Sequence, residues 1–250
     1  MSLTNKVVIV TGASSGIGAA IAVAFSSAGA NVAVVGRNET KLSNVAAKCT
    51  NPLVIIADVT KEKDARAVID KTIKKFDKLD VLINNAGLTV SASILQGDMM
   101  KAYDTIMDIN VRAVVQLTTL AAPHLVKTKG NIVNISSVAG QLAPVYPSTI
   151  NYNMSKAAVT HFGKCAAVEF AEHGVRVNTV SPGPVYTDFL ENSKSSIKWE
   201  QYKAINVLKR VSEPDEIADL VLFLASDKAR GITGSEFVSD NGTCIKRLAQ

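Results

Sequence analysis

Short apolar runs rich in β-branched residues alternate along the chain with longer segments of helical periodicity. The runs predict strands at residues 6–10, 31–35, 53–57, 81–84, 131–135, 176–180 and 236–238, and the segments between them predict helices at 19–28, 39–48, 62–76, 103–127, 152–172 and 214–225. The runs are continuously apolar, which is typical of strands that are buried on both faces. The sequence therefore predicts a doubly wound α/β fold, in which helices cover both faces of a seven-stranded parallel sheet.

The chain has 250 residues, of which 47% are hydrophobic and 20% charged, so it is long enough to bury one sizeable core. No stretch rich in Pro, Gly or Ser divides it, and we expect one domain over residues 1–250. Two segments, 88–100 and 182–211, interrupt the alternation. Both follow the carboxyl ends of predicted strands, where open parallel sheets bind their ligands.

The second of these segments mixes apolar side chains with Lys and Ser residues. Its apolar members include Tyr186, Phe189, Leu190, Trp199 and Tyr202. The pattern fits an apolar lid over a substrate, at about residues 184–211, and it fits equally a surface helix that packs these rings on the core. Together with the apolar residues of 144–146, it predicts a lipophilic substrate.

The composition argues against several classes of protein. The 27 Lys and Arg are scattered among 22 Asp and Glu, and only 5% of residues are aromatic, so no nucleic-acid partner is expected. The three cysteines lack C-x-x-C spacing and the three histidines lack H-E-x-x-H spacing, so neither a disulfide framework nor a metal site is expected. The longest uncharged run, residues 7–36, contains five glycines, and we expect no membrane span and a cytoplasmic location.

A glycine-rich loop follows the first predicted strand. It consists of Thr11, Gly12, Ala13, Ser14, Ser15, Gly16, Ile17 and Gly18. Glycines allow a tight turn here and let the N–H groups of a helix N-terminus approach a pyrophosphate. No Lys follows the last glycine, which disfavours a nucleoside triphosphatase. The loop predicts a dinucleotide site, and the alternative is a plain turn between a strand and a helix.

The second predicted strand ends with Arg37 and without a carboxylate, at the point where a ribose 2′ position arrives. Arg37 can pair with a 2′-phosphate, so NADP(H) is favoured over NAD(H), although an arginine that is solvated or stacked on adenine is the alternative. Asp58 is expected to accept from the adenine amino group or to cap the next helix. Asn84 and Asn85 can satisfy strand-end amides, and Gly87 lets the backbone approach a ligand.

Tyr152 and Lys156 lie four residues apart on a predicted helix, so their side chains share one face. Hydride transfer at an alcohol carbon requires a proton to move to or from the oxygen, and a tuned phenol can carry it. An ammonium ~4 Å away at an effective dielectric of ~20 supplies about 4 kcal/mol, which lowers a phenol pKa from ~10 to ~7. Ser137 is placed to bind the substrate oxygen, and Asn110 to hold a water that links Lys156 to solvent. The alternatives are a surface pair for Tyr152 and Lys156, and a buried amide bonded to a neighbouring helix for Asn110.

These motifs, TGxxxGxG at 11–18, NNAG at 84–87, Ser137 and YxxxK at 152–156, together resemble the single-domain branch of the short-chain dehydrogenase/reductase family. Their order and spacing cover nearly the whole chain. The resemblance implies a Rossmann-like fold and a catalytic tetrad of Asn110, Ser137, Tyr152 and Lys156. In it, Tyr152 is the acid/base, Ser137 polarises the substrate oxygen, Lys156 lowers the phenol pKa and holds the nicotinamide ribose, and Asn110 completes a proton relay.

The resemblance also implies the residues that contact the cofactor. These are Gly12, Ser14, Ser15, Gly16, Ile17, Gly18, Arg37, Asp58, Val59, Asn85, Ala86, Gly87, Tyr152, Lys156, Pro182, Gly183, Val185 and Thr187. A basic residue that the family carries in the glycine loop is absent here, so the NADP preference depends on Arg37. The family further implies a homotetramer or homodimer, with an interface on the helices that contain Asn110 and Tyr152.

The implied activity is the NADP-dependent interconversion of a carbonyl and a secondary alcohol on a small lipophilic molecule. This covers ketone and aldehyde reductases and alcohol, steroid or isoprenoid dehydrogenases. The alternatives are a 3-oxoacyl thioester reductase and a catalytically silent NADP-binding sensor or scaffold. An enoyl reductase would have a wider separation between the Tyr and the Lys.

Overall fold

The computed structural model describes residues 2–144, 148–192 and 198–245. Within them, a seven-stranded parallel sheet has the order β3-β2-β1-β4-β5-β6-β7. The strands are β1 (Val7–Thr11), β2 (Asn31–Gly36), β3 (Leu53–Ile56), β4 (Val81–Asn84), β5 (Asn131–Ile135), β6 (Arg176–Pro182) and β7 (Glu236–Ser239). This sheet confirms the predicted α/β fold, and the strand order reverses between β1 and β4, where doubly wound folds bind their ligands.

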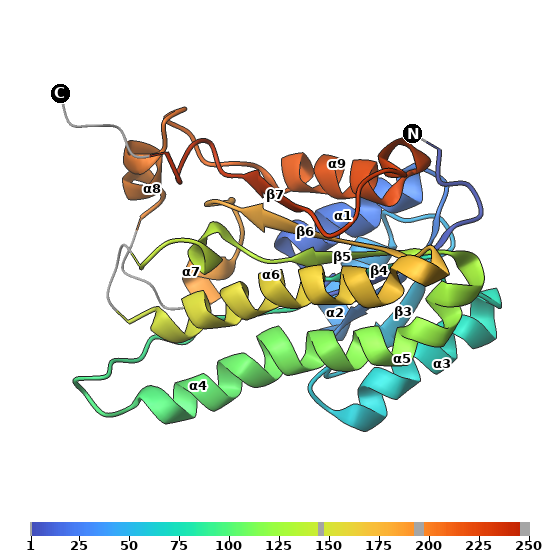
Figure 1. The fold of residues 1–250 in the computed structure, drawn as a ribbon, viewed down its shortest axis with the longest axis horizontal. Helices are drawn as coiled ribbons and strands as arrows, with labels where there is room; N and C mark the ends of the chain where they lie inside the picture. The colour runs from blue at the N-terminus through green and yellow to red at the C-terminus, as the bar shows by residue number, and fades with distance from the viewer. Residues whose placement is uncertain (1, 145–147, 193–197, 246–250) are drawn as a thin grey trace.

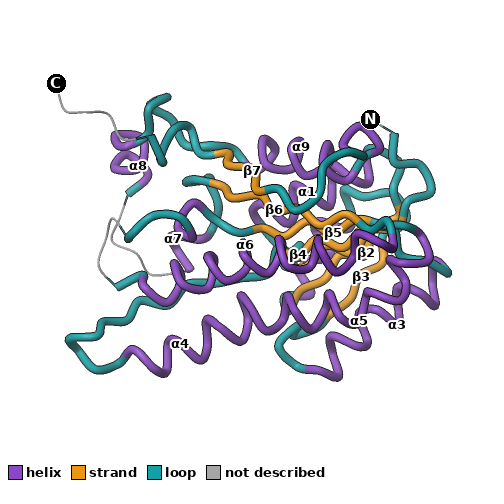
Figure 2. The backbone as a smooth tube through the Cα atoms, viewed as in Figure 1, coloured by secondary structure: helices purple, strands orange, loops and turns teal. Residues whose placement is uncertain are grey.

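Helices cover both faces of the sheet (Figure 1). The α-helices are α1 (Gly16–Ser27), α2 (Glu39–Ala46), α3 (Glu62–Phe76), α4 (Met99–Met107), α5 (Ala113–Thr128), α6 (Ile150–Phe170), α7 (Phe189–Asn192), α8 (Trp199–Ile205) and α9 (Pro214–Ala225). Short helical turns are η1 (Asp108–Arg112), η2 (Val138–Gly140), η3 (Ala171–His173) and η4 (Asp227–Ala229). The strands lie between the two helical layers, and α4, α7 and α8 extend to one side of the sheet (Figure 2).

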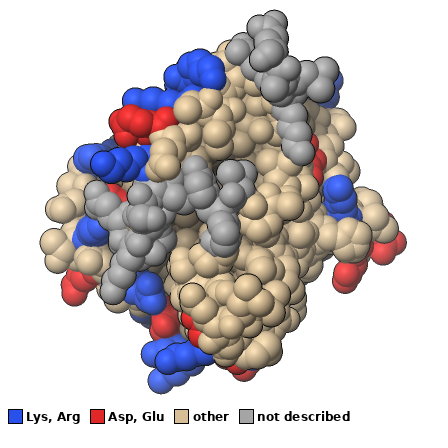
Figure 3. Space-filling model, turned by 90° about the vertical axis from the view of Figure 1, so that its left-hand side faces the viewer, with Lys and Arg blue, Asp and Glu red and all other residues tan. Residues whose placement is uncertain are grey.

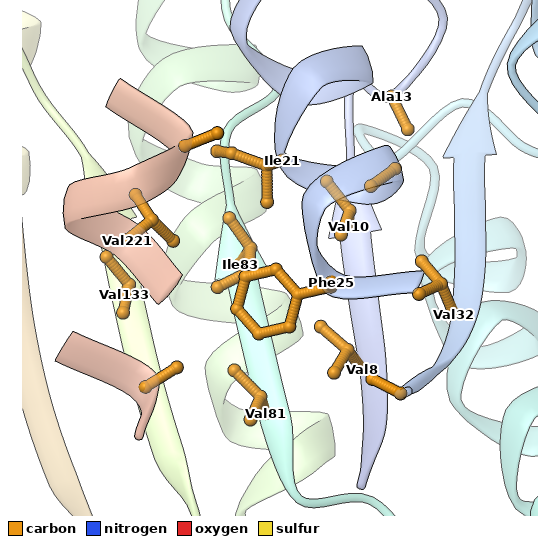
Figure 4. Packing of buried hydrophobic residues seen from close by; sticks show 14 of the residues in the cluster. Val8, Val10, Ala13, Ile21, Phe25, Val32, Val81, Ile83, Val133 and Val221 are labelled. Atoms are coloured by element: carbon orange, nitrogen blue, oxygen red, sulfur yellow. The ribbon is translucent and has the colours of Figure 1, made fainter. Parts of the chain in front are cut away.

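Two hydrophobic clusters fix the helical layers to the sheet. In one, Phe25 of α1 is fully buried and lies among Val8, Ile83 and Val221, so that α1 and α9 pack on the same face (Figure 4). In the other, the side chains that β1 directs to the opposite face pack against α3, α5 and α6. Successive strand residues point to opposite faces, so a continuously apolar strand serves both clusters.

The predicted helix over 103–127 differs from the structure. Helix α4 begins at Met99, four residues before the predicted start, and a π-helical turn, η1, separates it from α5. A π turn adds one residue to a helical turn and leaves the apolar pattern on either side intact, so periodicity does not detect it. The turn places Asn110, its central residue, against the segment that follows β4.

The segment after β6 forms the short helices α7 and α8, which fall within the predicted lid. Residues 145–147 and 193–197 lie outside the described residues; 145 and 146 belong to the predicted apolar residues of 144–146, and 193–197 to the predicted lid. In the described part of the chain, no helix is both long and apolar enough to cross a membrane.

Candidate active site

The glycine loop is held in place by the segment that follows β4. The side-chain amide of Asn85 donates to the carbonyl oxygens of Thr11, at 2.9 Å, and Gly12, at 3.3 Å. In return, the Thr11 hydroxyl accepts from the backbone N–H groups of Asn85 and Ala86. A Cβ at Gly18 would lie 2.3 Å from the Gly12 carbonyl oxygen, so this position admits glycine only. The NNAG motif thus shapes the loop as well as the wall beside it.

The first turn of α1 is suited to an anion. Gly12 and Gly16 have φ values of +65° and +54°, which turn the chain sharply between β1 and α1. No acidic side chain lies in the first turn of α1, and the Ser15 side chain makes no capping hydrogen bond. The positive end of the helix dipole is therefore available to a pyrophosphate.

Arg37 and Asp58 lie together where β2 and β3 end. Burial opposes ionisation of Asp58, but hydrogen bonds from Thr60 and the charges of Arg37 and Lys61 outweigh it and lower the pKa of this carboxyl below its ordinary value. The predicted helix cap is wrong, because Lys61 precedes α3 and Asp58 instead closes a turn by accepting from Thr60. Asp58 therefore stays ionised beside Arg37 at the predicted adenosine end.

Tyr152 and Lys156 share one face of α6, as their spacing predicts. The Lys156 ammonium lies 5.6 Å from the centre of the Tyr152 ring and donates to the carbonyl oxygen of Ile135 at 2.9 Å. Ser137 follows β5, and its side chain lies near enough to the Tyr152 phenol to lower the pKa of that group. The Ser137 hydroxyl donates to the carbonyl oxygen of Pro182 at 3.4 Å. The hydroxyl of Ser137 also accepts from the N–H of Ala139, which fixes it at the start of η2. The phenol, the hydroxyl and the ammonium thus come together from α6 and the end of β5.

The pKa values of Tyr152 and Lys156 differ from those of an isolated phenol and an isolated ammonium. Burial raises the pKa of Tyr152 to about 12, which outweighs the lowering effect of Ser137. Burial also lowers the pKa of Lys156 to about 8. Both shifts disfavour the charged forms, because the packed side chains around them replace water. In the protein alone, desolvation therefore outweighs the charge effect that spacing predicts.

Asn110 lies directly behind these groups. Its amide oxygen accepts from the N–H of Leu88 at 2.9 Å, and its amide nitrogen donates to the Leu88 carbonyl and, at 3.0 Å, to the Ser155 hydroxyl. A Cβ at Gly87 would lie 3.1 Å from the Asn110 oxygen and 3.6 Å from the Lys156 nitrogen, so the three residues are close neighbours. The side chain of Asn110 is therefore a buried amide bonded to neighbouring segments, which is the alternative left open by its sequence.

One cavity of about 490 Å³ connects the glycine loop to Tyr152. All the residues predicted to contact a cofactor line it, namely Gly12, Ser14, Ser15, Gly16, Ile17, Gly18, Arg37, Asp58, Val59, Asn85, Ala86, Gly87, Tyr152, Lys156, Pro182, Gly183, Val185 and Thr187. Ser137 lines it too, whereas Asn110 does not. Thr187 lies against Gly16, so the start of the predicted lid passes over the glycine loop.

Beyond Tyr152, the cavity has apolar and aromatic walls. The ring of Phe189 lies 5.6 Å from that of Tyr152, and Trp199 packs edge-on against Tyr186 at 5.0 Å and beside Tyr202 at 6.0 Å. Phe189, Trp199 and Tyr202 line the cavity. The sequence analysis missed other wall residues, Ser91, Leu142, Asn153, Ile205 and Thr243. Ser91 and Ile205 lie in the segments 88–100 and 182–211 that the sequence marks, and Asn153 adjoins Tyr152 in the YxxxK motif, but nothing in the sequence marks Leu142 or Thr243.

Comparisons with known proteins agree with this geometry. A family model described as enoyl-(acyl carrier protein) reductase matches residues 12–244. L-fucose dehydrogenase from Bos taurus is 34% identical over 95% of this chain and 89% of its own length. A 3-oxoacyl-[acyl-carrier-protein] reductase from Thermotoga maritima is 34% identical over 98% of this chain and its full length, 100%. A solved 3-ketoacyl-(acyl-carrier-protein) reductase from Brucella melitensis, complexed with NADH, has a TM-score of 0.90 and 30% identity, and the match covers 98% of this chain and 100% of that one.

The chain belongs to the short-chain dehydrogenase/reductase family. As a member of this family it is an oxidoreductase that acts on CH–OH groups, interconverting a carbonyl and an alcohol, and it uses a nicotinamide cofactor. The structure fits such a cofactor, because the cavity offers an uncapped helix N-terminus for a pyrophosphate and a loop whose glycines allow close approach.

Proposed function

We propose that this short-chain dehydrogenase/reductase interconverts a lipophilic ketone or aldehyde and the corresponding alcohol with NADP(H). The observation that carries the proposal is the single cavity that runs from Arg37 and the glycine loop, past Tyr152, to apolar and aromatic walls. The nicotinamide, when bound, supplies or accepts the hydride. The residues of this chain bind the cofactor and the substrate, exclude water and move the proton.

Tyr152 is the proton donor and acceptor in this proposal. With a pKa of about 12 its phenol is fully protonated near neutral pH, which is the form that gives a proton to the oxygen of a reduced carbonyl. Ser137 lies beside the same phenol and orients the carbonyl oxygen toward it. Lys156, with a pKa of about 8, is largely protonated at pH 7 and holds positive charge beside the alkoxide that develops. Asn110 fixes the backbone at Leu88, next to Gly87 in the wall of the cavity.

The NADP preference is supported by the charges at the end of β2. Arg37 lines the cavity there, and Asp58, the carboxylate that lines the same end of the cavity, follows β3 rather than β2. A 2′-phosphate gains a paired guanidinium at this position, whereas a 2′-hydroxyl finds no acceptor at the end of β2.

The preference for a lipophilic substrate is supported by how few charged residues of the cavity are available to a substrate. Among its described lining residues, Arg37 and Asp58 lie at the adenosine end, and Asp188 is paired with Lys41 at 2.8 Å. Lys156 lies beside Tyr152. The face that carries α4, α7 and α8 is largely uncharged, with Lys, Arg, Asp and Glu mainly toward its edges (Figure 3). A phosphorylated carrier would require cationic partners, and among the described lining residues only Arg37 and Lys156 are cations.

The names of two bacterial relatives suggest a second candidate, reduction of a 3-oxoacyl thioester. The acyl chain of such a substrate also fits apolar walls, so the two candidates differ in the thioester head group.

We further propose that residues 1–250 form one domain with a substrate lid at about 184–211. The chain would act as a homotetramer or homodimer through the helices that contain Asn110 and Tyr152, which are the continuous segment of α4, η1 and α5, and α6. Exposed apolar side chains on these helices, Val115, Met154 and Val168, support that interface, because burying them in an oligomer is favourable. A cytoplasmic location remains part of the proposal.

A panel of substrates tests the activity. Purified protein is assayed with NADPH and with NADH against acetophenone, 2-decanone, decanal and an acetoacetyl thioester, and in the oxidising direction with L-fucose. We expect NADPH-dependent reduction of the simple carbonyls. Turnover of the thioester alone would favour the second candidate, and absence of turnover with all of them would contradict the enzyme assignment in favour of a sensor or scaffold.

Two variants test the roles. Tyr152→Phe retains the ring and removes the transferable proton, so we expect turnover to be lost while NADPH still binds. Substantial residual turnover would contradict the assigned acid/base. Arg37→Asp is expected to reverse the cofactor preference, and an unchanged affinity for NADPH in a fluorescence titration would show that the phosphate is held elsewhere.

A further inference from the structure

The turn that carries Ser137 packs directly on the backbone of α6. A Cβ at Gly140, the last residue of η2, would lie 2.8 Å from the N of Ala157 and 2.8 Å from the carbonyl carbon of Lys156. Only glycine allows this approach. The distance between the Ser137 hydroxyl and the groups on α6 therefore depends on how η2 is held against the helix.

The beginning of this turn is anchored through Ser136. Its hydroxyl donates to the carbonyl oxygen of Lys156 at 2.8 Å and accepts from the Thr160 hydroxyl at 2.8 Å. Both partners belong to α6, and Ser136, Lys156 and Thr160 are buried. The residue just before Ser137 is thus tied to the helix one turn beyond Tyr152.

The end of the turn is anchored by a carboxylate from another element. Gln141, which follows η2, donates from its side-chain nitrogen to Glu236 Oε1 at 2.7 Å. The same oxygen accepts from the Ser181 hydroxyl of β6 at 2.6 Å and lies 3.5 Å from the Thr160 hydroxyl. Glu236 opens β7, and neither it nor Gln141 lines the cavity. One oxygen outside the active site thus joins the end of η2 to β6, whereas the Thr160 hydroxyl of α6 gives its proton to Ser136.

We propose that Glu236 is a positioning residue for the reaction: by holding Gln141 to Ser181 of β6, next to Pro182, whose carbonyl accepts from the Ser137 hydroxyl at 3.4 Å, it keeps η2 in place and so keeps Ser137 beside Tyr152. Without the carboxylate, Gln141 is a solvent-exposed side chain at the end of a three-residue turn and no longer restrains it. The hydrogen bonds to an ionised acceptor are stronger than those between neutral groups, which suits a carboxylate to this role. The inference rests on the proposed role of Ser137.

The test compares Glu236→Ala, Glu236→Gln, Gln141→Ala and the double variant with alanine at both positions. Asp80→Asn is a matched control, because the Asp80 carboxylate accepts from the N–H of Val7 at 2.9 Å and binds two lysines at the opposite end of the strands. Three quantities are measured for each: hydrogen exchange of the backbone amides of residues 139–142, NADPH affinity, and kcat and KM for the carbonyl that the panel identifies.

We expect Glu236→Ala and Gln141→Ala to speed exchange in 139–142 and to lower kcat by about tenfold, with NADPH affinity within about twofold of the wild type. The kcat of the double variant should be no lower than that of Glu236→Ala alone, because both substitutions break the same connection. Glu236→Gln keeps an oxygen acceptor and should retain kcat within about threefold. Asp80→Asn should lower the melting temperature and leave exchange in 139–142 and kcat unchanged.

Unchanged exchange in 139–142 for both alanine variants would overturn the proposal, as would losses in kcat that multiply in the double variant. A wild type that reduces no carbonyl would instead refute the proposed function. The exchange measurement needs no substrate, so the two failures are distinguishable.

Discussion

The buried ammonium of Lys156 should destabilise the protein in the absence of cofactor. The side chain is buried on α6, its one hydrogen bond within the described part of the chain goes to the Ile135 carbonyl at 2.9 Å, and no carboxylate there forms an ion pair with it. Burial lowers its pKa from 10.5 to about 8. We therefore predict that Lys156→Met, which fills a similar space without the charge, makes the protein more stable and inactive.

The magnitude follows from the two pKa values. A decrease from 10.5 to about 8 corresponds to about 3 kcal/mol against the folded state when the group is charged. Methionine leaves the Ile135 carbonyl without its donor, which costs about 1 kcal/mol. The variant should therefore gain about 2 kcal/mol at pH 7, a rise in melting temperature of about 4–8 °C for a chain of this length.

The gain should depend on pH with a defined sign. The folded-state pKa lies below the unfolded one, so the unfolded chain binds more protons between about pH 8 and 10.5. In that window the wild type gains stability as the pH rises. The advantage of the variant is therefore complete below about pH 8 and decreases by about 1.4 kcal/mol for each pH unit above it.

The assay is urea unfolding of cofactor-free protein, followed by circular dichroism at pH 7.0, 8.5 and 9.5. Lys164→Met is the control, because Lys164 is an exposed lysine of the same helix and its loss should change stability little at any of these pH values. A variant at Lys156 that is less stable than the wild type at pH 7, or whose advantage is the same at pH 9.5, would refute the reasoning. Higher stability together with lost turnover would show that Lys156 is retained for catalysis although it lowers the stability of the fold.

Three further predictions concern the core, the loop and the lid. Phe25→Ala removes a fully buried ring between α1 and the sheet and should lower the free energy of unfolding by about 3–5 kcal/mol in the same urea assay. Gly18→Ala places a Cβ 2.3 Å from the Gly12 carbonyl oxygen, so NADPH binding should be lost in a fluorescence titration; a normal affinity would show that the loop can shift. Asp188→Asn breaks the ion pair between Asp188 and Lys41. Because both side chains are partly exposed, this ion pair is weak, so the rate of NADPH release should increase by no more than about fivefold. The increase should disappear in 0.5 M NaCl, which screens the pair.

The elements of the fold were predictable because their signals are local. Continuous apolar runs predicted all seven strands to within one or two residues, since each strand must bury both of its faces. The glycine loop was predictable because its backbone conformation excludes other residues, and the shared face of Tyr152 and Lys156 because four residues make about one helical turn. The residues that line the cavity at the carboxyl ends of the strands were predictable from the topology, because parallel strands end at the same edge of the sheet.

The chemistry of those residues depended on contacts that no local pattern encodes. The spacing of Tyr152 and Lys156 predicted a lowered phenol pKa, but the segments packed around them remove water and raise it to about 12. The π turn put Asn110 against Leu88, and β7 brought Glu236 to Gln141, a residue 95 positions earlier in the chain. Sequence alone thus determined which side chains meet at one edge of the sheet, because periodicity and backbone conformation act over a few residues. Only the tertiary structure decided their protonation and support, because desolvation and long-range hydrogen bonds depend on every element that packs around a group.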